Sequence, residues 1–199
     1  MRVKMRLCRW NSEVFRAAFG GLLVLLAGLA AASDARAAAS AWAEEAQARL
    51  RLISAQQSVA GDTIDLGLEF DLQPGWKIYW RSPGDAGLPP RVDWSGSENL
   101  AGADIAWPVP HRFSLFGLET FGYGGQVVLP ITARLERPDA PLGLRAKVDY
   151  LICEEICIPY TAEIAFDLPP GDGARAPQAF LIDSFSSQVP GLGAERGLE

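Results

Sequence analysis

The sequence predicts an all-β protein built as an antiparallel β-sandwich. About eight short segments have the composition of strands, and turn-forming residues separate them roughly every eight to twelve positions. The clearest segment is residues 62–72, in which every second residue is large and apolar: Ile64, Leu66, Leu68, Phe70 and Leu72. No segment before residue 178 has the periodicity of an amphipathic helix. This combination favours an immunoglobulin-like sandwich with a short C-terminal helix or tail, and a closed barrel is the alternative.

The other strands are expected wherever apolar and polar residues alternate or aromatic residues gather. In chain order they are residues 49–56, 76–81, 91–94, 103–107, 126–135, 142–152 and 158–168. A Gln-Pro-Gly turn at residues 73–75 and a loop at residues 82–90, which holds three prolines, separate the early strands.

Two later regions lack a strand pattern. Residues 108–125 are rich in glycine and aromatic side chains and are predicted to be a long irregular loop folded over a core or a site. Residues 169–177 are expected to be a linker and residues 180–189 a short helix, followed by a frayed end.

The first 37 residues are predicted to be a secretory signal peptide. Five basic residues precede a run without charged residues over residues 17–32, and the Ala35-Arg36-Ala37 sequence offers a small-x-small cleavage site. An uncleaved membrane anchor is the alternative, although sixteen residues are short for a span of about 20. We therefore expect export, cleavage near Ala37, a domain over residues 38–170 and a linker and tail over residues 171–199.

Composition excludes several function classes. The formal net charge is −6, and it becomes −10 once the six basic and two acidic residues of the signal are removed, which argues against a nucleic-acid partner. Once Cys8 leaves with the signal, two cysteines and one histidine remain, and they cannot build a four-ligand Cys/His zinc site without carboxylate help. No Gly-x-Ser-x-Gly motif indicates a serine hydrolase.

Cleavage would leave Cys153 and Cys157 as the only cysteines. Strands are expected on both sides of them, so the three intervening residues predict a tight hairpin in which a cross-strand disulfide is feasible. Closing a five-residue loop contributes only about 2 kcal/mol, so a redox role is favoured over a structural bond. Metal binding by two thiolates, to Cu(I) or zinc, is a further alternative.

Glu154 and Glu155 lie between the two cysteines. They are expected to be solvated hairpin residues or to tune the pKa of the thiols, since negative neighbours disfavour a thiolate. The motif is not of the thioredoxin type, which has two intervening residues at a helix start. The thiols should therefore need a partner protein to activate them.

Three segments together resemble a known family. They are Gly-Trp-Lys-Ile-Tyr-Trp-Arg at residues 75–81, the aromatic region from Phe116 into Leu-Pro-Ile at residues 129–131, and Tyr-Leu-Ile-Cys…Cys-Ile-Pro at residues 150–159. The series resembles the amino-terminal periplasmic domain of the thiol:disulfide interchange protein DsbD, and more closely the ScsB-like protein-disulfide reductases.

The resemblance implies an immunoglobulin-like fold in the periplasm that needs no cofactor or metal. The cysteine pair would take electrons from a membrane-embedded DsbD/ScsB-type donor and pass them to an oxidised periplasmic thioredoxin-fold acceptor. By position, Phe116 would cap the pair, Tyr79 would form a wall of the site, Cys157 would attack the partner and Cys153 would resolve the mixed disulfide. A non-catalytic immunoglobulin-like binding module and a periplasmic copper-handling protein are the alternatives.

Two departures from the family pattern affect these expectations. The DsbD pair is spaced more widely than three residues. The sequence also lacks the family's membrane and C-terminal thioredoxin domains. We therefore expect a separate membrane partner, or that this chain is a piece of a longer protein.

Overall fold

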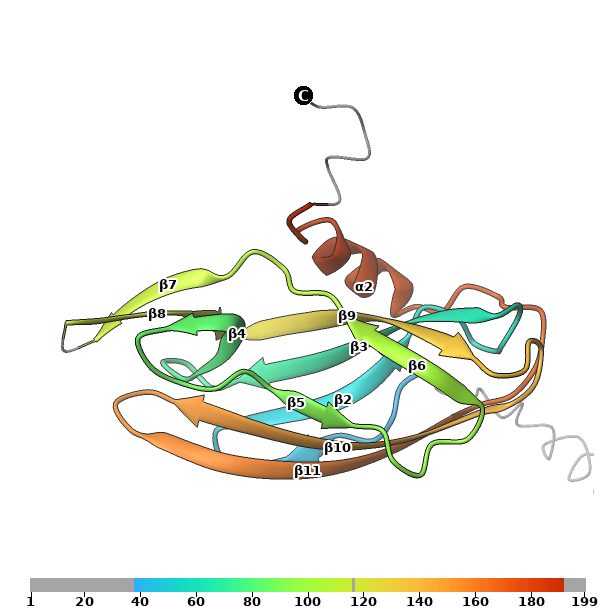
Figure 1. Ribbon diagram of the computed structural model, residues 1–199, viewed down its shortest axis with the longest axis horizontal. Coiled ribbons are helices and arrows are strands. Elements are labelled where there is room, and N and C mark those ends of the chain that lie inside the picture. The colour runs from blue at the N-terminus through green and yellow to red at the C-terminus, as the bar shows by residue number, and fades with distance from the viewer. Residues whose placement is uncertain (1–37, 116, 192–199) are drawn as a thin grey trace, which may run out of the picture. The chain divides into compact units, whose positions relative to one another are not determined.

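Two antiparallel β-sheets packed face to face make up most of the structure, a computed structural model that describes residues 38–115 and 117–191 (Figure 1). The predicted signal peptide and Phe116 lie outside the described residues. The predicted antiparallel sandwich is confirmed, and the two sheets do not close into one barrel.

The first sheet has five strands in the order β1-β2-β3-β9-β6, each antiparallel to its neighbours. Their bounds are β1 (Ala43–Glu44), β2 (Ala48–Ser54), β3 (Thr63–Leu72), β9 (Gln126–Leu135) and β6 (Leu100–Ile105).

The second sheet has six strands, five of them in the order β11-β10-β4-β8-β7. Their bounds are β11 (Cys157–Leu168), β10 (Leu142–Cys153), β4 (Lys77–Gly84), β8 (Leu118–Gly124) and β7 (His111–Leu115). The sixth strand, β5 (Arg91–Asp93), pairs with residues 147–149 of β10, whereas β4 meets β10 only at Cys153. The closed ends of the β7–β8 and β10–β11 hairpins therefore lie at the same end of the domain (Figure 1).

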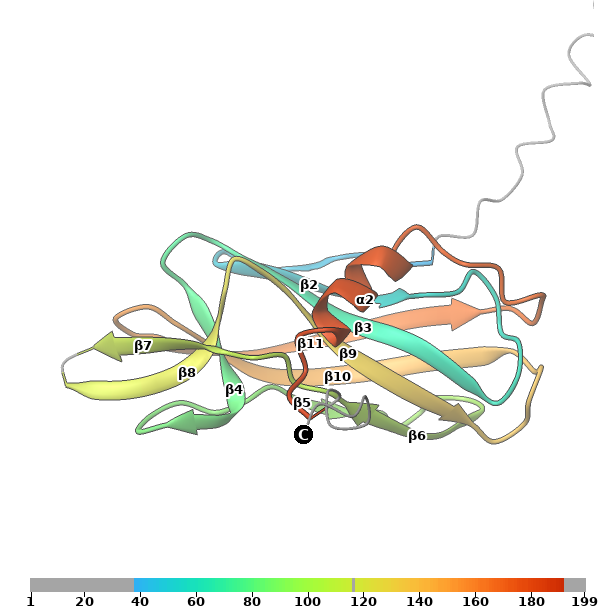
Figure 2. The same cartoon turned by 90° about the horizontal axis from the view of Figure 1, so that it is seen from above.

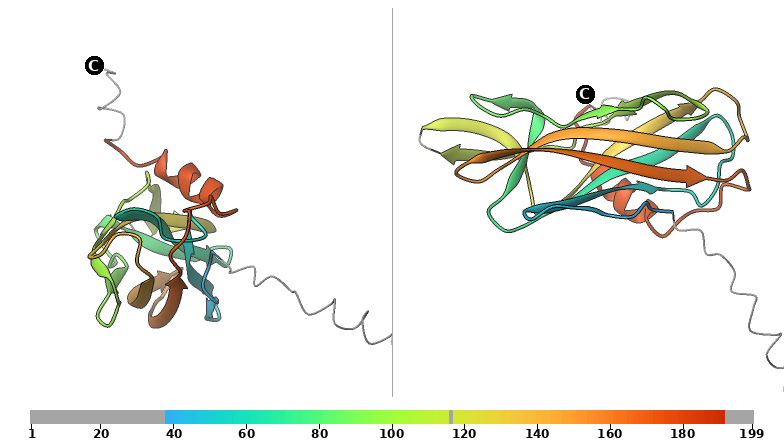
Figure 3. Two further views of the ribbon diagram at one scale, coloured as in Figure 1. Left: turned by 90° about the vertical axis from the view of Figure 1, so that its right-hand side faces the viewer. Right: turned by 90° about the horizontal axis from the view of Figure 1, so that it is seen from below.

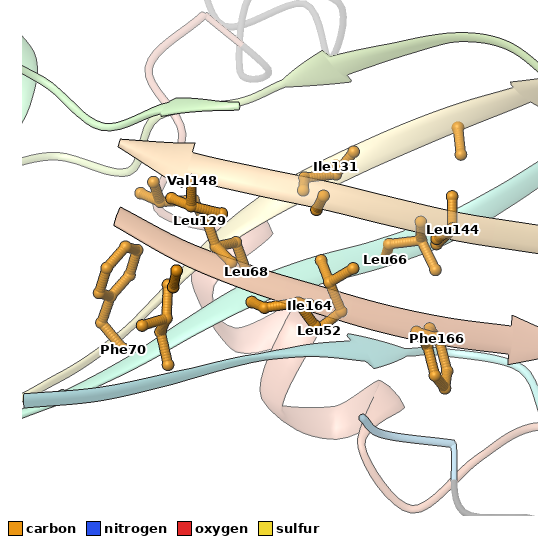
Figure 4. Packing of buried hydrophobic residues seen from close by; sticks show 14 of the residues in the cluster. Leu52, Leu66, Leu68, Phe70, Leu129, Ile131, Leu144, Val148, Ile164 and Phe166 are labelled. Atoms are coloured by element: carbon orange, nitrogen blue, oxygen red, sulfur yellow. The ribbon is translucent and has the colours of Figure 1, made fainter. Parts of the chain in front are cut away.

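The alternating residues of both sheets meet in one apolar core (Figure 4). Leu66, Leu68 and Phe70 of β3 face Leu144 and Val148 of β10, and all five are fully buried. Burial of such side chains contributes about 1.5–3 kcal/mol each, so this inner layer supplies most of the stability of the fold.

Helix α2 (Ala179–Ser186) covers the other face of the five-stranded sheet, where it lies across β9 and β3 (Figure 2). Ala179 and Ile182 pack on Ile53 and Val128 in a second small core. Gly67 has no side chain, and a Cβ at this position would collide with the Val128 side chain. Backbone hydrogen bonds hold the segment that leads into the helix, and the Gln188 carbonyl accepts one from the Val109 amide. The segment predicted as linker and tail is thus packed on the domain as far as Gln188. This helix falls short of the length and apolar character that a membrane span requires, and no other is described in residues 38–115 and 117–191.

The prediction of an irregular loop over residues 108–125 is wrong. Most of it forms the β7–β8 hairpin, in which His111 pairs with Gly122 and Leu115 with Leu118. The apolar–polar alternation is missing because β8 has glycines, Gly122 and Gly124, where polar residues would stand. Part of the loop predicted at residues 82–90 also belongs to a strand, since β4 resumes pairing with β8 at Gly84 after an irregular stretch.

Candidate redox site

Cys153 ends β10 and Cys157 begins β11, so the pair closes the β10–β11 hairpin. The two residues are register partners with Cα atoms 4.2 Å apart, and their sulfur atoms form a disulfide. The Glu154 amide donates a hydrogen bond to the Ile156 carbonyl and tightens the turn between them. The predicted tight hairpin with a cross-strand bond is confirmed.

The two cysteines differ in accessibility. Cys153 is 1% exposed, whereas Cys157 belongs to the exposed residues. Ile156, beside Cys157 in the turn, is 65% exposed. An incoming protein can therefore reach Cys157 first, while Cys153 is shielded.

The disulfide lies on the outer face of the six-stranded sheet, away from the main core. Side chains alternate along β10, so Val148, Tyr150 and Ile152 point inward and Cys153 points outward. The register partner of Cys153 on β4 is Lys77, and register partners share a face. Tyr79 lies two residues further along β4, so its side chain is on the same outer face of the sheet as that of Lys77. Figure 3 shows β4 passing the closed end of the β10–β11 hairpin.

A separate cover buries these outward side chains. Gly87 has a φ of +97°, and its Cα lies so close to Tyr79 that a Cβ would collide with the ring. On the other side, the Phe113 ring of β7 has its centroid 5.4 Å from the Lys77 Nζ atom. Tyr79 is consequently 3% exposed and Lys77 7% exposed, although neither belongs to the sandwich core.

Tyr79 contacts the accessible sulfur. Its hydroxyl oxygen is 3.7 Å from the Cys157 Sγ atom, and the hydroxyl supplies the hydrogen because the sulfur is in a disulfide. Burial raises the pKa of Tyr79, so this hydroxyl stays protonated at neutral pH. Its register partner on β8 is Gly122, where a Cβ would collide with the Ile78 carbonyl oxygen. The close approach of β8 thus fixes the backbone that carries Tyr79.

Lys77 lies on the side of the buried sulfur. Its Nζ atom donates a hydrogen bond of 3.4 Å to the carbonyl oxygen of Glu154, the residue after Cys153. Burial lowers the pKa of Lys77, and the nearby Glu154 carboxylate opposes that shift. Sequence reasoning did not single out Lys77 or Phe113. The sequence signal available for Lys77 was its position two residues before Tyr79 in an aromatic strand.

The remaining expected site residues have different outcomes. Glu154 and Glu155 are both exposed, and only Glu154 has a described link to the site, through Lys77 and through the turn at Gly75. A role in tuning the thiol pKa stays a prediction for both. The Phe116 cap lies outside the described residues. Among the residues that the structure does describe, no three His, Cys, Asp or Glu side chains form a group that could hold a metal ion.

A hollow of about 370 Å³ lies beside the disulfide on the same outer face. Its floor includes Leu151 and Pro159, which are the next outward register pair after the two cysteines. Leu88, Pro89 and Arg91 form the wall. The accessible sulfur therefore has a concave surface next to it.

Comparison with known proteins assigns the family. The model of "Thiol:disulfide interchange protein DsbD, N-terminal" matches residues 49–169. The crystal structure of the N-terminal periplasmic domain of ScsB from Proteus mirabilis is 27% identical, with a TM-score of 0.62 over 77% of this chain. The chain covers 60% of that structure's length.

The N-terminal domain of Neisseria meningitidis DsbD in the reduced form is 14% identical, with a TM-score of 0.33 over 60% of this chain and 86% of that one. No curated protein sequence matches. The family model covers more than half of the sequence. The chain therefore belongs to the family of DsbD amino-terminal domains, which are thiol–disulfide exchange modules.

Proposed function

We propose that this protein is a periplasmic thiol–disulfide exchange module that acts as a protein-disulfide reductase through Cys153 and Cys157. One observation carries the proposal: an exposed Cys157 is bonded to a buried Cys153 beside the Tyr79 hydroxyl, outside the sandwich core. A bond that only stabilised the fold would gain more by joining distant strands than by closing a hairpin.

The reaction begins with the reduced pair. The Cys157 thiolate attacks one sulfur of a partner disulfide, which forms a mixed disulfide and releases the other partner sulfur as a thiolate. Cys153 then attacks the Cys157 sulfur, the Cys153–Cys157 bond forms, and the second partner thiolate leaves. Two electrons pass to the partner, and the two protons lost by the pair balance those taken up by the partner thiolates. In the first step the Tyr79 hydroxyl donates a hydrogen bond to the Cys157 thiolate.

The family and the surface around the pair support the proposed partners. A membrane-embedded DsbD/ScsB-type reductase would supply the electrons, and an oxidised periplasmic thioredoxin-fold protein would receive them. The basic, then apolar start of the sequence supports export, and the ScsB domain is described as periplasmic. The exposed Ile156 and the adjacent hollow supply apolar contact area around Cys157, as a transient protein partner requires.

Covalent trapping tests the roles of the two cysteines. The reduced, mature protein carrying Cys153→Ser is mixed with an oxidised thioredoxin and separated on a non-reducing gel. We expect a mixed disulfide to accumulate, because the attacking sulfur remains and the resolving one is gone. The matched Cys157→Ser variant should give none, and the wild-type protein should reduce thioredoxin without accumulating the complex. Trapping by Cys157→Ser alone would reverse the roles, and failure of all three proteins to react would reject the function.

The reduction potential separates this function from a structural disulfide. Equilibration of the mature protein with glutathione or dithiothreitol buffers should give a value of roughly −270 to −120 mV, between thioredoxin and the strongest periplasmic oxidants. A value below about −300 mV would mark a structural bond and favour the binding-module alternative.

A further inference from the structure

Lys77 is a buried cation in an acidic protein. The sequence has three lysines, and the two within the described residues are Lys77 and Lys147. Lys147 is exposed on β10, whereas Lys77 is 7% exposed on β4. Burying an ammonium group is unfavourable unless nearby groups compensate, so its position next to the cysteines requires a physical explanation.

The register places Lys77 beside Cys153. They are direct cross-strand partners on one face of the sheet, where the Cβ atoms of such partners lie about 4.5–5.5 Å apart. The ammonium group bonds the Glu154 carbonyl and so stays at the cysteine end of the strand. Tyr79 contacts Cys157 from the same strand and face. Of the two outward side chains of β4, Tyr79 therefore contacts the Cys157 sulfur, and Lys77 is the cross-strand neighbour of Cys153.

The groups around Lys77 favour its charged form. The Phe113 ring attracts the ammonium through its π face, and the Glu154 carboxylate lies close enough to interact with it. Neither group neutralises the site as a buried carboxylate would, since Glu154 itself is exposed. The positive charge remains available to a new negative charge on the buried side of the site.

We propose that Lys77 is a positioning residue whose ammonium group stabilises the Cys153 thiolate, and that Glu154 weakens this effect by competing for the same charge. The proposal rests on the function proposed above. Burial alone favours the neutral Cys153 thiol, which is a poor nucleophile, so a shielded resolving cysteine needs a compensating cation. Lys77 supplies it without making Cys153 accessible to other oxidants.

The charge acts on the resolving step. The Cys153 thiolate attacks the Cys157 sulfur of the mixed disulfide, the Cys153–Cys157 bond forms, and the partner sulfur leaves as a thiolate that takes a proton from water. Lys77 gains and loses no proton in this step. The other titratable groups on β4, β7, β8 and the turn are Tyr79, Arg81, His111, Arg112, Glu119, Tyr123, Glu154 and Glu155.

The test measures the pKa of Cys153 directly. In the reduced, mature Cys157→Ser background a single thiol remains, and its thiolate absorbance near 240 nm is followed against pH. Lys77→Met should raise the thiol pKa by about one unit, so that the thiolate fraction at pH 7 falls about tenfold. Lys77→Arg should restore most of the lost shift. Lys147→Met, which removes an exposed lysine of the same sheet, should leave the pKa unchanged.

Glu154→Gln provides a test that does not depend on a buried substitution. Removing the competing carboxylate should lower the Cys153 pKa, in the direction opposite to Lys77→Met. Circular dichroism checks that each variant is folded. The proposal is overturned if a folded Lys77→Met protein titrates like Lys147→Met, or if Glu154→Gln does not lower the pKa when Lys77→Met is unfolded.

These outcomes are independent of the relay function. A wild-type protein that fails to reduce thioredoxin would reject the proposed function even if Lys77→Met shifts the thiol pKa. A wild-type protein that reduces thioredoxin, with no pKa shift in Lys77→Met, would reject only the role of Lys77.

Discussion

Ile152 and Cys153 are neighbours on β10, and both are almost completely buried, but different parts of the molecule bury them. Ile152 points inward and is covered by the five-stranded sheet. Cys153 points outward, toward a site covered by the loop around Gly87 and by Phe113 of the β7–β8 hairpin. A loop and a two-stranded hairpin open locally at a lower free energy than a packed sheet does. The comparison indicates that the inner face holds the fold together, whereas the outer face carries the disulfide of the proposed exchange site.

The sharpest test of this division is a truncation on the inner face. Leu144→Ala on β10 should lower the free energy of unfolding by about 3 kcal/mol, since Leu144 is fully buried and its removal leaves a cavity. The thiol-exchange rate of the folded variant should stay within about twofold of wild type. Urea unfolding and thioredoxin reduction measure the two effects. Lys147→Ala, an outward change on the same strand, is the control and should cost less than about 0.5 kcal/mol. A folded Leu144→Ala protein with strongly reduced exchange would contradict the division.

Two glycines of β8 sharpen the comparison on the outer face. Gly122→Ala should destabilise the protein by about 2 kcal/mol, because its Cβ would collide with the Ile78 carbonyl oxygen next to Tyr79. Gly124→Ala, on the same strand and face, should be nearly neutral, since its nearest neighbour, the Trp76 carbonyl oxygen, is 3.5 Å away. Thermal unfolding measures both. Equal losses would mean that β8 can shift away from β4 without consequence.

The smallest expected effects concern two buried tyrosines of the core. The Tyr123 hydroxyl donates a hydrogen bond of 2.8 Å to the Pro108 carbonyl, whereas the Tyr150 hydroxyl has no partner among the described residues. Tyr123→Phe should cost about 1 kcal/mol and Tyr150→Phe about zero or slightly less. A clear loss of stability in Tyr150→Phe at pH 7 would show that its hydroxyl is satisfied after all.

The same pair predicts the response to alkaline pH. Burial raises the pKa of both hydroxyls above the ordinary value of 10.0. The unfolded chain therefore loses these protons first, so the stability they contribute is complete below about pH 10 and falls as the pH rises further. Urea unfolding from pH 8 to 11 should show a shallower decline for Tyr150→Phe than for wild type. An identical decline would contradict the assignment.

Periodicity predicted the strands well where one face of a strand meets the core. Residues 62–72 and 142–152 are covered by β3 and β10 almost to the residue, because their inward side chains are large and their outward ones polar. The same reasoning failed at the β7–β8 hairpin. There the hairpin extends to the end of the domain, and Gly122 allows close backbone approach to β4 instead of marking a turn.

The candidate site was likewise predicted only in part from the sequence. The spacing of Cys153 and Cys157 predicted the hairpin and its bond, and the family resemblance pointed to Tyr79, which contacts Cys157. Apart from the position of Lys77 two residues before Tyr79, nothing in the local pattern indicated Lys77 or Phe113. Both reach the site from strands whose registers bring them there, and a register depends on residues far apart in the sequence.

The sequence by itself determined that this chain is a β-sandwich with a disulfide-forming pair at a hairpin, because alternation and short-range spacing are local properties. Only the tertiary structure decided which cysteine is shielded. The Gly87 loop lies against Tyr79, and Phe113 of the β7–β8 hairpin lies against Lys77, so distant segments cover the two β4 residues next to the pair. Cys153 pairs with Lys77, a residue 76 positions away in the sequence. Such distant segments set the solvation and the charge around a thiol, and these control its pKa.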